Sequence, residues 1–292
     1  MPKIRIDQFL QKHRLPAEYA FTINEWFLPL AEKLVLEQKI QSKPLIIGIN
    51  GAQGTGKSTL ADLLKTVFEQ DEQLTVASLS LDDFYLTHQQ RTDLAHTVHP
   101  LMATRGVPGT HDIALAIDTI RHLFQLDSET FIPRFDKTND DRHKQSQWTS
   151  VVGAVDIIIL EGWCMGAEAQ SIEQLSTPVN DLEENEDADR GWRYYINQQL
   201  HYSYPSLFSL VDQWIMLKAP SFDCVSNWRL EQEHKLRSSI ADPKKTMDDN
   251  EIERFIKFYQ RITEHLLQTL PGKVDYLFEL NSERKINRLI KK

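Results

Sequence analysis

The feature that most constrains the fold of this 292-residue chain is a glycine-rich segment between an apolar run and an amphipathic stretch. The segment GAQGTGKS (51–58) fits the pattern G-x-x-x-x-G-K-[ST]. It follows the run LIIGIN (45–50) and precedes STLADLLKTVFEQ (58–70), whose apolar residues recur at helical spacing. Glycines let such a loop wrap closely, so that backbone N–H groups and the helix N-terminus face phosphate oxygens. The order strand, loop and helix therefore predicts a phosphate-binding loop in an α/β fold.

The loop also predicts a ligand and roles for individual residues. We expect Lys57 to bridge the terminal phosphates and the Ser58 hydroxyl to hold magnesium. The expected ligand is a nucleoside triphosphate, taken as ATP, together with Mg²⁺. A glycine-rich turn that matches by chance is the alternative, and the flanking elements argue against it. The residues expected to contact the nucleotide are Gly51, Ala52, Gln53, Gly54, Thr55, Gly56, Lys57, Ser58 and Thr59.

Four further apolar runs resemble the first one. They are LTVASLS (74–80), VDIIIL (155–160), VDQWIML (211–217) and VDYLFEL (274–280). Runs of this kind are typical of strands buried on both faces of a parallel sheet, and the chain between them is long enough for crossover helices. The predicted fold is the P-loop NTPase fold, with a five-stranded, mostly parallel sheet sandwiched by helices.

The remaining segments give the expected domain organisation. Residues 1–42 carry apolar residues at helical spacing and are predicted to form a helical N-terminal extension of a P-loop domain spanning 43–292, with an insertion near 166–205. The acidic run DLEENEDAD (181–189) is predicted to be a solvated loop. The basic tail is predicted to end in a helix that carries Ile286, Leu289 and Ile290.

Composition excludes several classes of function. No apolar run approaches the ~20 residues that cross a bilayer, and no signal peptide is visible, so we expect a cytoplasmic protein without a membrane partner. A net charge of -9 disfavours nucleic acid as a partner. The two cysteines, Cys164 and Cys224, lack the spacing of a zinc site or a disulfide framework and are expected to be reduced. The oligomeric state is not predicted.

Carboxylates follow two of the predicted strands. Ligands of a parallel sheet gather beyond the carboxyl ends of its strands, so Asp82 is expected near the terminal phosphate. There it could orient an acceptor hydroxyl and take its proton. Asp83 could bind metal-bound water or organise the turn, and a helix cap is the alternative for both residues. Glu161 is expected to support magnesium, unless it is an ordinary polar residue at a strand end.

Six motifs together resemble the glycerate kinase family, a branch of the P-loop kinases that also includes uridine kinase, phosphoribulokinase and pantothenate kinase. The resemblance extends over residues 45 to 290 and rests on GINGAQGTGKSTL, LSLDDFYLT, RGVPGTHD, PRFDK, DIIILEGW and NWRLEQE, in this order. It implies that Asp82 activates the acceptor, that Tyr85 lines the acceptor pocket and that Glu161 serves magnesium. It also implies a helical lid around NWRLEQEHKLR, from which Arg229 reaches the transferring phosphate. An amphipathic surface helix remains the alternative there.

Basic residues in two predicted loops indicate the kind of acceptor. Arg105 lies in the glycine-containing RGVPGTHD loop, where its guanidinium could bind a carboxylate. Arg134 and Lys137 add cations in a second loop, although Lys137 could instead form a surface ion pair. His111 could hydrogen-bond the substrate or be a structural histidine. These residues favour a small hydroxy acid as substrate.

The sequence thus predicts an ATP-dependent kinase that phosphorylates a hydroxyl of a small acidic metabolite, with glycerate preferred. Pantothenate, a nucleoside or a sugar phosphate remain alternative acceptors. A nucleotide-binding regulatory protein without catalytic activity is the alternative from another class. Asp82, Glu161 and Arg229 together argue against it, because a mere binder needs no base on the acceptor side.

Overall fold

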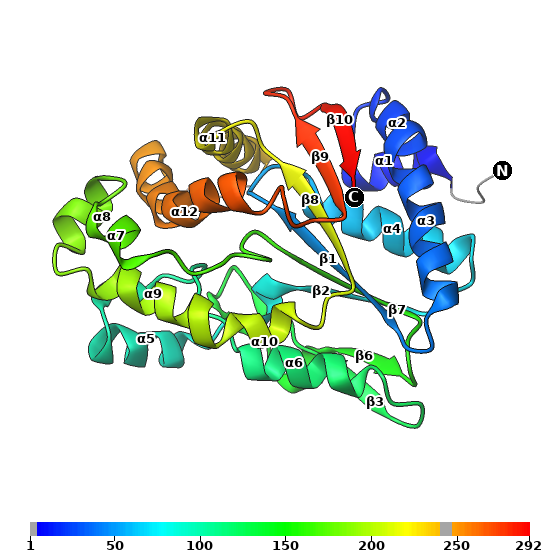
Figure 1. The fold of residues 1–292 in the computed structure, drawn as a ribbon, viewed down its shortest axis with the longest axis horizontal. Coiled ribbons are helices and arrows are strands. Elements are labelled where there is room, and N and C mark those ends of the chain that lie inside the picture. The colour runs from blue at the N-terminus through cyan, green and yellow to red at the C-terminus, as the bar shows by residue number, and fades with distance from the viewer. Residues whose placement is uncertain (1–4, 240–246) are drawn as a thin grey trace.

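The computed structural model describes residues 5–239 and 247–292, so the first four residues of the predicted N-terminal extension lie outside it. The described chain is built on a six-stranded sheet with the order β10-β9-β8-β1-β7-β2 (Figure 1). Five of these strands run parallel, and their bounds are β1 Leu45–Gly51, β2 Val76–Ser80, β7 Ile157–Gly162, β8 Gln213–Lys218 and β9 Tyr276–Leu280. They lie at the five predicted runs, which confirms the predicted α/β fold.

Helices cover both faces of this sheet. Alternation along the strands separates the two cores: Ile46 packs on one face and its neighbour Ile47 on the other. The first face is covered by α6 (Ile113–His122), α9 (Gly191–Tyr202), α10 (Tyr204–Phe208) and α12 (Asp249–Thr269). The second face is covered by α1 (Ile6–His13), α3 (Leu28–Ile40) and α4 (Lys57–Gln70). The result is a three-layer arrangement in which the carboxyl ends of the parallel strands share one edge.

The N-terminal segment is part of the second layer. Its helices α1, α2 (Tyr19–Thr22) and α3 flank a π-helical turn, Ile23–Phe27. Phe27 meets Phe278 of β9 edge to face, with ring centroids 5.7 Å apart. Lys12 and His13 both contact Asp62 of α4, at 2.6 and 2.7 Å. The segment therefore packs directly on the helix that follows the glycine-rich loop.

Smaller elements complete the described chain. Helical ones are 3₁₀ turns at Leu81–Phe84, Pro100–Ala103 and Gln145–Gln147, together with α5 (His88–Thr97), α7 (Ile172–Ser176), α8 (Asp181–Glu186) and α11 (Phe222–Ser239). Two small antiparallel sheets pair β3 (Glu129–Ile132) with β6 (Thr149–Val152), and β4 (Phe135–Asp136) with β5 (Asp141–Arg142). In the part of the chain that the structure describes, no helix has the length and apolar character needed to cross a membrane.

The predicted C-terminal helix is wrong. Residues Ile286–Lys291 form β10, which pairs antiparallel with β9 after a turn in which Arg284 has φ 65°. The spacing of Ile286, Leu289 and Ile290 fits a helix, but an isolated helix this short is marginal in water. The free edge of β9 offers backbone partners instead.

The predicted solvated loop at 181–189 is only partly right: most of its residues are exposed, but the segment is not simply a loop. Its first part forms α8, and Glu183 and Asp187 are buried. Arg261 of α12 binds Glu183 at 2.5 Å, and Arg193 of α9 binds Asp187 at 2.7 Å. A buried carboxylate is tolerated when it is paired in this way. The arginines come from other elements, so the local composition could not show the pairing.

Candidate active site

The glycine-rich loop closes tightly at the carboxyl end of β1. Gly54 and Gly56 have φ of 82° and 90°, a conformation that side chains rarely adopt. A Cβ at Gly54 would also lie 2.8 Å from Cβ of Trp228 in α11. Thr55 donates its hydroxyl hydrogen to the Ala52 carbonyl at 2.8 Å, which stabilises the turn. The loop then runs directly into α4, whose first residue is Lys57.

Ser58 and Glu161 form the part of the site that could hold a metal ion. The Ser58 hydroxyl donates to Oε1 of Glu161 at 3.0 Å, while Lys57 Nζ lies 3.9 Å from Oε2. Glu161 is 7% exposed at the end of β7, and its Oε2 has no hydrogen-bond partner among the described residues. A buried carboxylate oxygen with an unused lone pair beside a hydroxyl is a donor set that suits Mg²⁺, which prefers oxygen ligands. These residues therefore fit the expected ion.

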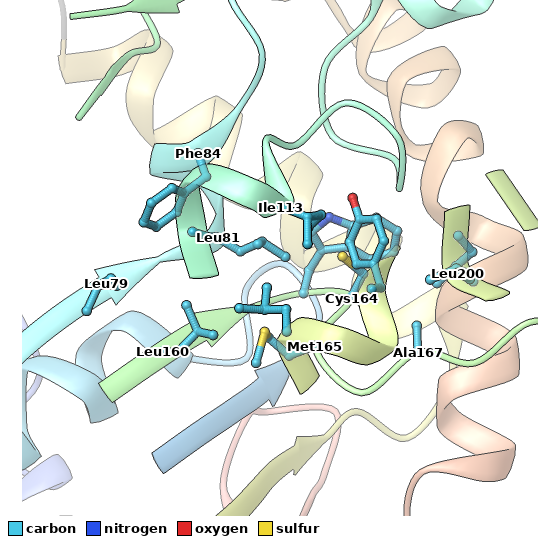
Figure 2. Packing of buried hydrophobic residues seen from close by; sticks show 14 of the residues in the cluster. Leu79, Leu81, Phe84, Ile113, Leu160, Cys164, Met165, Ala167 and Leu200 are labelled. Atoms are coloured by element: carbon cyan, nitrogen blue, oxygen red, sulfur yellow. The ribbon is translucent and has the colours of Figure 1, made fainter. Parts of the chain in front are cut away.

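Asp82 stands on a turn that the core holds in place. It follows β2 in the 3₁₀ turn Leu81–Phe84, and both Leu81 and Phe84 are fully buried. Figure 2 shows these two side chains beside Leu79 and Leu160, in the core between the sheet and its helices. The anchored turn fixes the backbone of Asp82, so its carboxylate projects from a rigid element rather than from a mobile loop.

The Asp82 carboxylate is held from two sides. The Tyr85 hydroxyl donates to Oδ1 at 2.7 Å, and Lys137 Nζ donates to Oδ2 at 2.7 Å. Burial opposes ionisation, but the charges of Lys137 and Lys57 and the two hydrogen bonds outweigh it and lower the pKa of Asp82 to about 2. Asp82 is therefore an anion at neutral pH, and it lies close enough to Lys57 for that charge to lower its pKa.

The second carboxylate, Asp83, joins the turn to the neighbouring hairpin. It accepts hydrogen bonds from Arg134 Nη1 at 2.7 Å and from the Phe135 backbone N–H at 3.2 Å. Arg134 also donates to the Thr149 hydroxyl at 2.9 Å. Both Asp83 and Arg134 are thus engaged with each other next to Asp82, and their expected contact with substrate stays a prediction.

Arg105 already has an acidic partner. Its guanidinium forms an ion pair with Asp140 and lies over the Phe135 ring, 5.4 Å from the centroid. Asp140 is shared with the buried Arg91, whose Nη2 lies 2.6 Å away. Both guanidiniums are therefore already paired with a protein carboxylate. The expected role of Arg105 in binding a substrate carboxylate stays a prediction.

His111 lies behind Tyr85 in a buried position. Its ring stacks on Tyr85 with centroids 4.7 Å apart, and its Nδ1 lies 2.6 Å from the Tyr204 hydroxyl. Its Nε2 has no hydrogen-bond partner among the described residues. Burial lowers the pKa of His111 to about 4, against a smaller opposing effect of the Asp82 charge. His111 is therefore neutral at pH 7 and offers a hydrogen bond rather than a charge.

Arg229 lies on the helix that covers the glycine-rich loop. Its Nη1 donates to Glu233 at 2.6 Å, and its guanidinium stands 5.7 Å from the centroid of the Phe255 ring. The preceding residue, Trp228, contacts Gly54 and donates its indole hydrogen to the Ser282 carbonyl at 2.9 Å. α11 is thus in contact with the loop, while the lid movement and the role of Arg229 stay predictions.

Sequence reasoning missed several residues that shape the site. Trp228 packs on Gly54, Asp140 pairs with Arg105, and the Tyr259 hydroxyl donates to the Arg105 carbonyl at 3.3 Å. The position of Trp228 beside Arg229 in the predicted lid was the one available signal. No sequence signal indicated Asp140 or Tyr259, because both contact Arg105, which is distant from them in the sequence.

Comparison with known proteins gives the chain its relatives. It is 34% identical over 251 residues to the uncharacterized kinase mug58 of Schizosaccharomyces pombe, covering 82% of this chain and 86% of that protein. It is 29% identical over 236 residues to the chloroplastic D-glycerate 3-kinase of Arabidopsis thaliana, covering 78% of this chain and 48% of that protein. The structure of a D-glycerate 3-kinase from Cryptococcus neoformans matches with a TM-score of 0.76 at 25% identity, covering 91% of this chain and 99% of that one. No protein-family model matches the chain.

These relatives agree with the geometry of the loop at residues 51–58. The relatives are named kinases, and the similar structures are P-loop kinases, so the chain is a phosphotransferase that uses ATP. The chain belongs to the glycerate kinase family of P-loop kinases.

Proposed function

We propose that this kinase transfers the γ-phosphate of ATP to a hydroxyl of a small hydroxy acid, and that D-glycerate is the acceptor. The observation that carries the proposal is the environment of Asp82. It is an anion on a rigid turn, and the charge of Lys57 helps to lower its pKa. A carboxylate in that position suits an acceptor hydroxyl. The D-glycerate 3-kinases among the relatives support the choice of acceptor.

In the proposed reaction Asp82 orients the acceptor hydroxyl and accepts its proton. The acceptor oxygen forms a bond to the γ-phosphorus, and the bond from that phosphorus to the bridging oxygen of ADP breaks. Lys57 and Arg229 stabilise the negative charge that spreads over the transferring group. Ser58 and Glu161 would hold Mg²⁺, which neutralises phosphate charge when bound.

The cations around Asp82 support an acidic acceptor. Arg105, Arg134 and Lys137 come from the 105–112 loop and the 133–142 segment, and they pair with Asp140, Asp83 and Asp82 respectively. In a partly buried site a guanidinium or ammonium favours a carboxylate over a neutral group, because hydrogen bonds between charged groups contribute about 1.5–3 kcal/mol. Tyr85 and His111 complete the acceptor side of the proposed site.

The proposal is tested by phosphoryl transfer from γ-labelled ATP to a panel of acceptors. The panel contains D-glycerate, L-glycerate, pantothenate, uridine, fructose 6-phosphate and glycerol, and the labelled product is identified by mass. We expect D-glycerate to give the highest kcat/KM. A higher value for pantothenate, uridine or the sugar phosphate would contradict the proposed acceptor. Tight ATP binding without transfer to any acceptor would contradict the proposed activity and indicate a regulatory protein.

A further inference from the structure

Lys137, in the turn of the β4–β5 hairpin, forms an ion pair with the proposed base, Asp82. Lys137 Nζ lies 2.7 Å from Oδ2 of Asp82, while the Tyr85 hydroxyl occupies Oδ1. Both carboxylate oxygens therefore accept a hydrogen bond from the protein before any acceptor arrives. Each oxygen keeps a second lone pair that an acceptor hydroxyl could use, but a carboxylate in contact with an ammonium is a weaker base for the hydroxyl proton. Burial and the Asp82 charge raise the pKa of Tyr85 well above its ordinary value, so the phenol keeps its proton and its place.

Lys137 is the most exposed of the cations that surround the acceptor side. Its side chain is 62% exposed, against 30% for Arg134 and 26% for Arg105. Arg134 is also tied to Asp83 and Thr149, and Arg105 to Asp140 and the Phe135 ring. An exposed ion pair contributes only ~0–1 kcal/mol, and a lysine ammonium swings on a flexible stem. Lys137 can therefore change partner at low cost, whereas the arginines would break several contacts.

We propose that Lys137 determines acceptor specificity by resting on Asp82 and moving to the carboxylate of the acceptor, so that an acidic group on the acceptor releases the base. This inference rests on the proposed function. The ammonium exchanges one carboxylate for another, so charge pairing is kept while Asp82 becomes a stronger base for the hydroxyl proton. An acceptor without a carboxylate leaves Lys137 on Asp82, and its hydroxyl then meets a weaker base. The acid group therefore contributes to kcat as well as to binding.

The test compares D-glycerate with its neutral amide as acceptors for the wild type, Lys137→Met and Lys137→Arg. In Lys137→Met we expect KM for D-glycerate to rise by about 10- to 100-fold, the factor that corresponds to a lost charged hydrogen bond. We also expect kcat for the amide to rise, because Asp82 is a stronger base without the neighbouring ammonium, so the ratio of kcat for the acid to kcat for the amide falls. Lys137→Arg should recover much of the KM for D-glycerate. Lys144→Met, at an exposed lysine that follows the hairpin, serves as the matched control and should leave both acceptors unchanged.

Three outcomes would overturn the inference. An equal fall in kcat for both acceptors with unchanged KM would make Lys137 a merely structural residue. A raised KM for D-glycerate without a gain for the amide would show that Lys137 binds the acid but does not release the base. A wild type that transfers phosphate to no hydroxy acid would refute the proposed function itself. The wild-type assay alone therefore separates that failure from the other two.

Discussion

Lys57 is proposed to bind ATP and Asp82 to act on the acceptor hydroxyl, so substitutions at the two residues should have different effects. Lys57→Ala removes a cation from the phosphate loop and should weaken ATP binding. Asp82→Asn keeps the size of the side chain but removes the base, so ATP binding should persist while kcat falls by about 10²- to 10⁴-fold. Calorimetric titration with ATP and steady-state kinetics with D-glycerate measure the two effects. Asp127→Asn, at an exposed residue, is the control. Equal loss of ATP binding in both active-site variants would contradict the assigned roles.

His111 is expected to make the stability of the folded chain depend on pH. The unfolded chain binds a proton at this residue below its ordinary pKa of 6.5, whereas the folded chain resists protonation down to about 4. The depressed pKa therefore contributes stability that is present above 6.5 and is lost as the pH falls toward 4. The expected loss from this residue is about 2 kcal/mol between pH 7 and pH 5. Urea unfolding at both pH values measures it, with His111→Gln as the comparison. If the variant loses as much stability on acidification as the wild type, His111 is not the group responsible.

At the scale of single residues, the sequence could place side chains at the edge of the sheet but could not predict their partners. Asp82 and Glu161 could be placed because each follows a predicted strand, and parallel strands end at a common edge. The pairs Lys137–Asp82, Arg134–Asp83 and Arg105–Asp140 join segments far apart in the chain. No local pattern reports such pairs. The three cations that were predicted to bind substrate therefore have protein partners that the sequence did not identify.

At the scale of elements, the predictable parts are those in which local pattern and tertiary environment agree. Strands buried on both faces read as continuous apolar runs, and the five parallel strands lie where those runs are. Helix α4 likewise buries the leucines that its spacing places on one face. β10 and α8 differ because a long-range partner decides them. β10 takes its backbone partners from β9, and the buried Glu183 of α8 is paired with Arg261 of α12.

At the scale of the whole molecule, the N-terminal segment completes a core rather than standing apart. Ile23, Phe27 and Leu34 share one buried cluster with Ile47 of β1 and Phe278 of β9. Tyr19 brings its hydroxyl within 4.0 Å of the place where a Cβ on Gly56 would lie. Because this layer covers the face of the sheet that carries α4, its integrity and that of the phosphate loop should be linked. The boundary predicted after residue 42 would then separate segments that unfold together.

This coupling is tested with two leucines of α3. Leu34 is fully buried and Leu36 is 60% exposed, so the pair gives a core substitution and a matched surface control on one helix. Leu34→Ala should lower the free energy of unfolding by about 2–5 kcal/mol, because it removes buried methyl groups and leaves a cavity. Leu36→Ala should change it by less than about 0.5 kcal/mol. Urea unfolding is followed by far-UV circular dichroism and, in parallel, by binding of a fluorescent ATP analogue. If one cooperative unit includes residues 5–42, both signals shift together in Leu34→Ala. An early loss of helix that leaves analogue binding at its wild-type midpoint would instead identify the N-terminal segment as a separate domain.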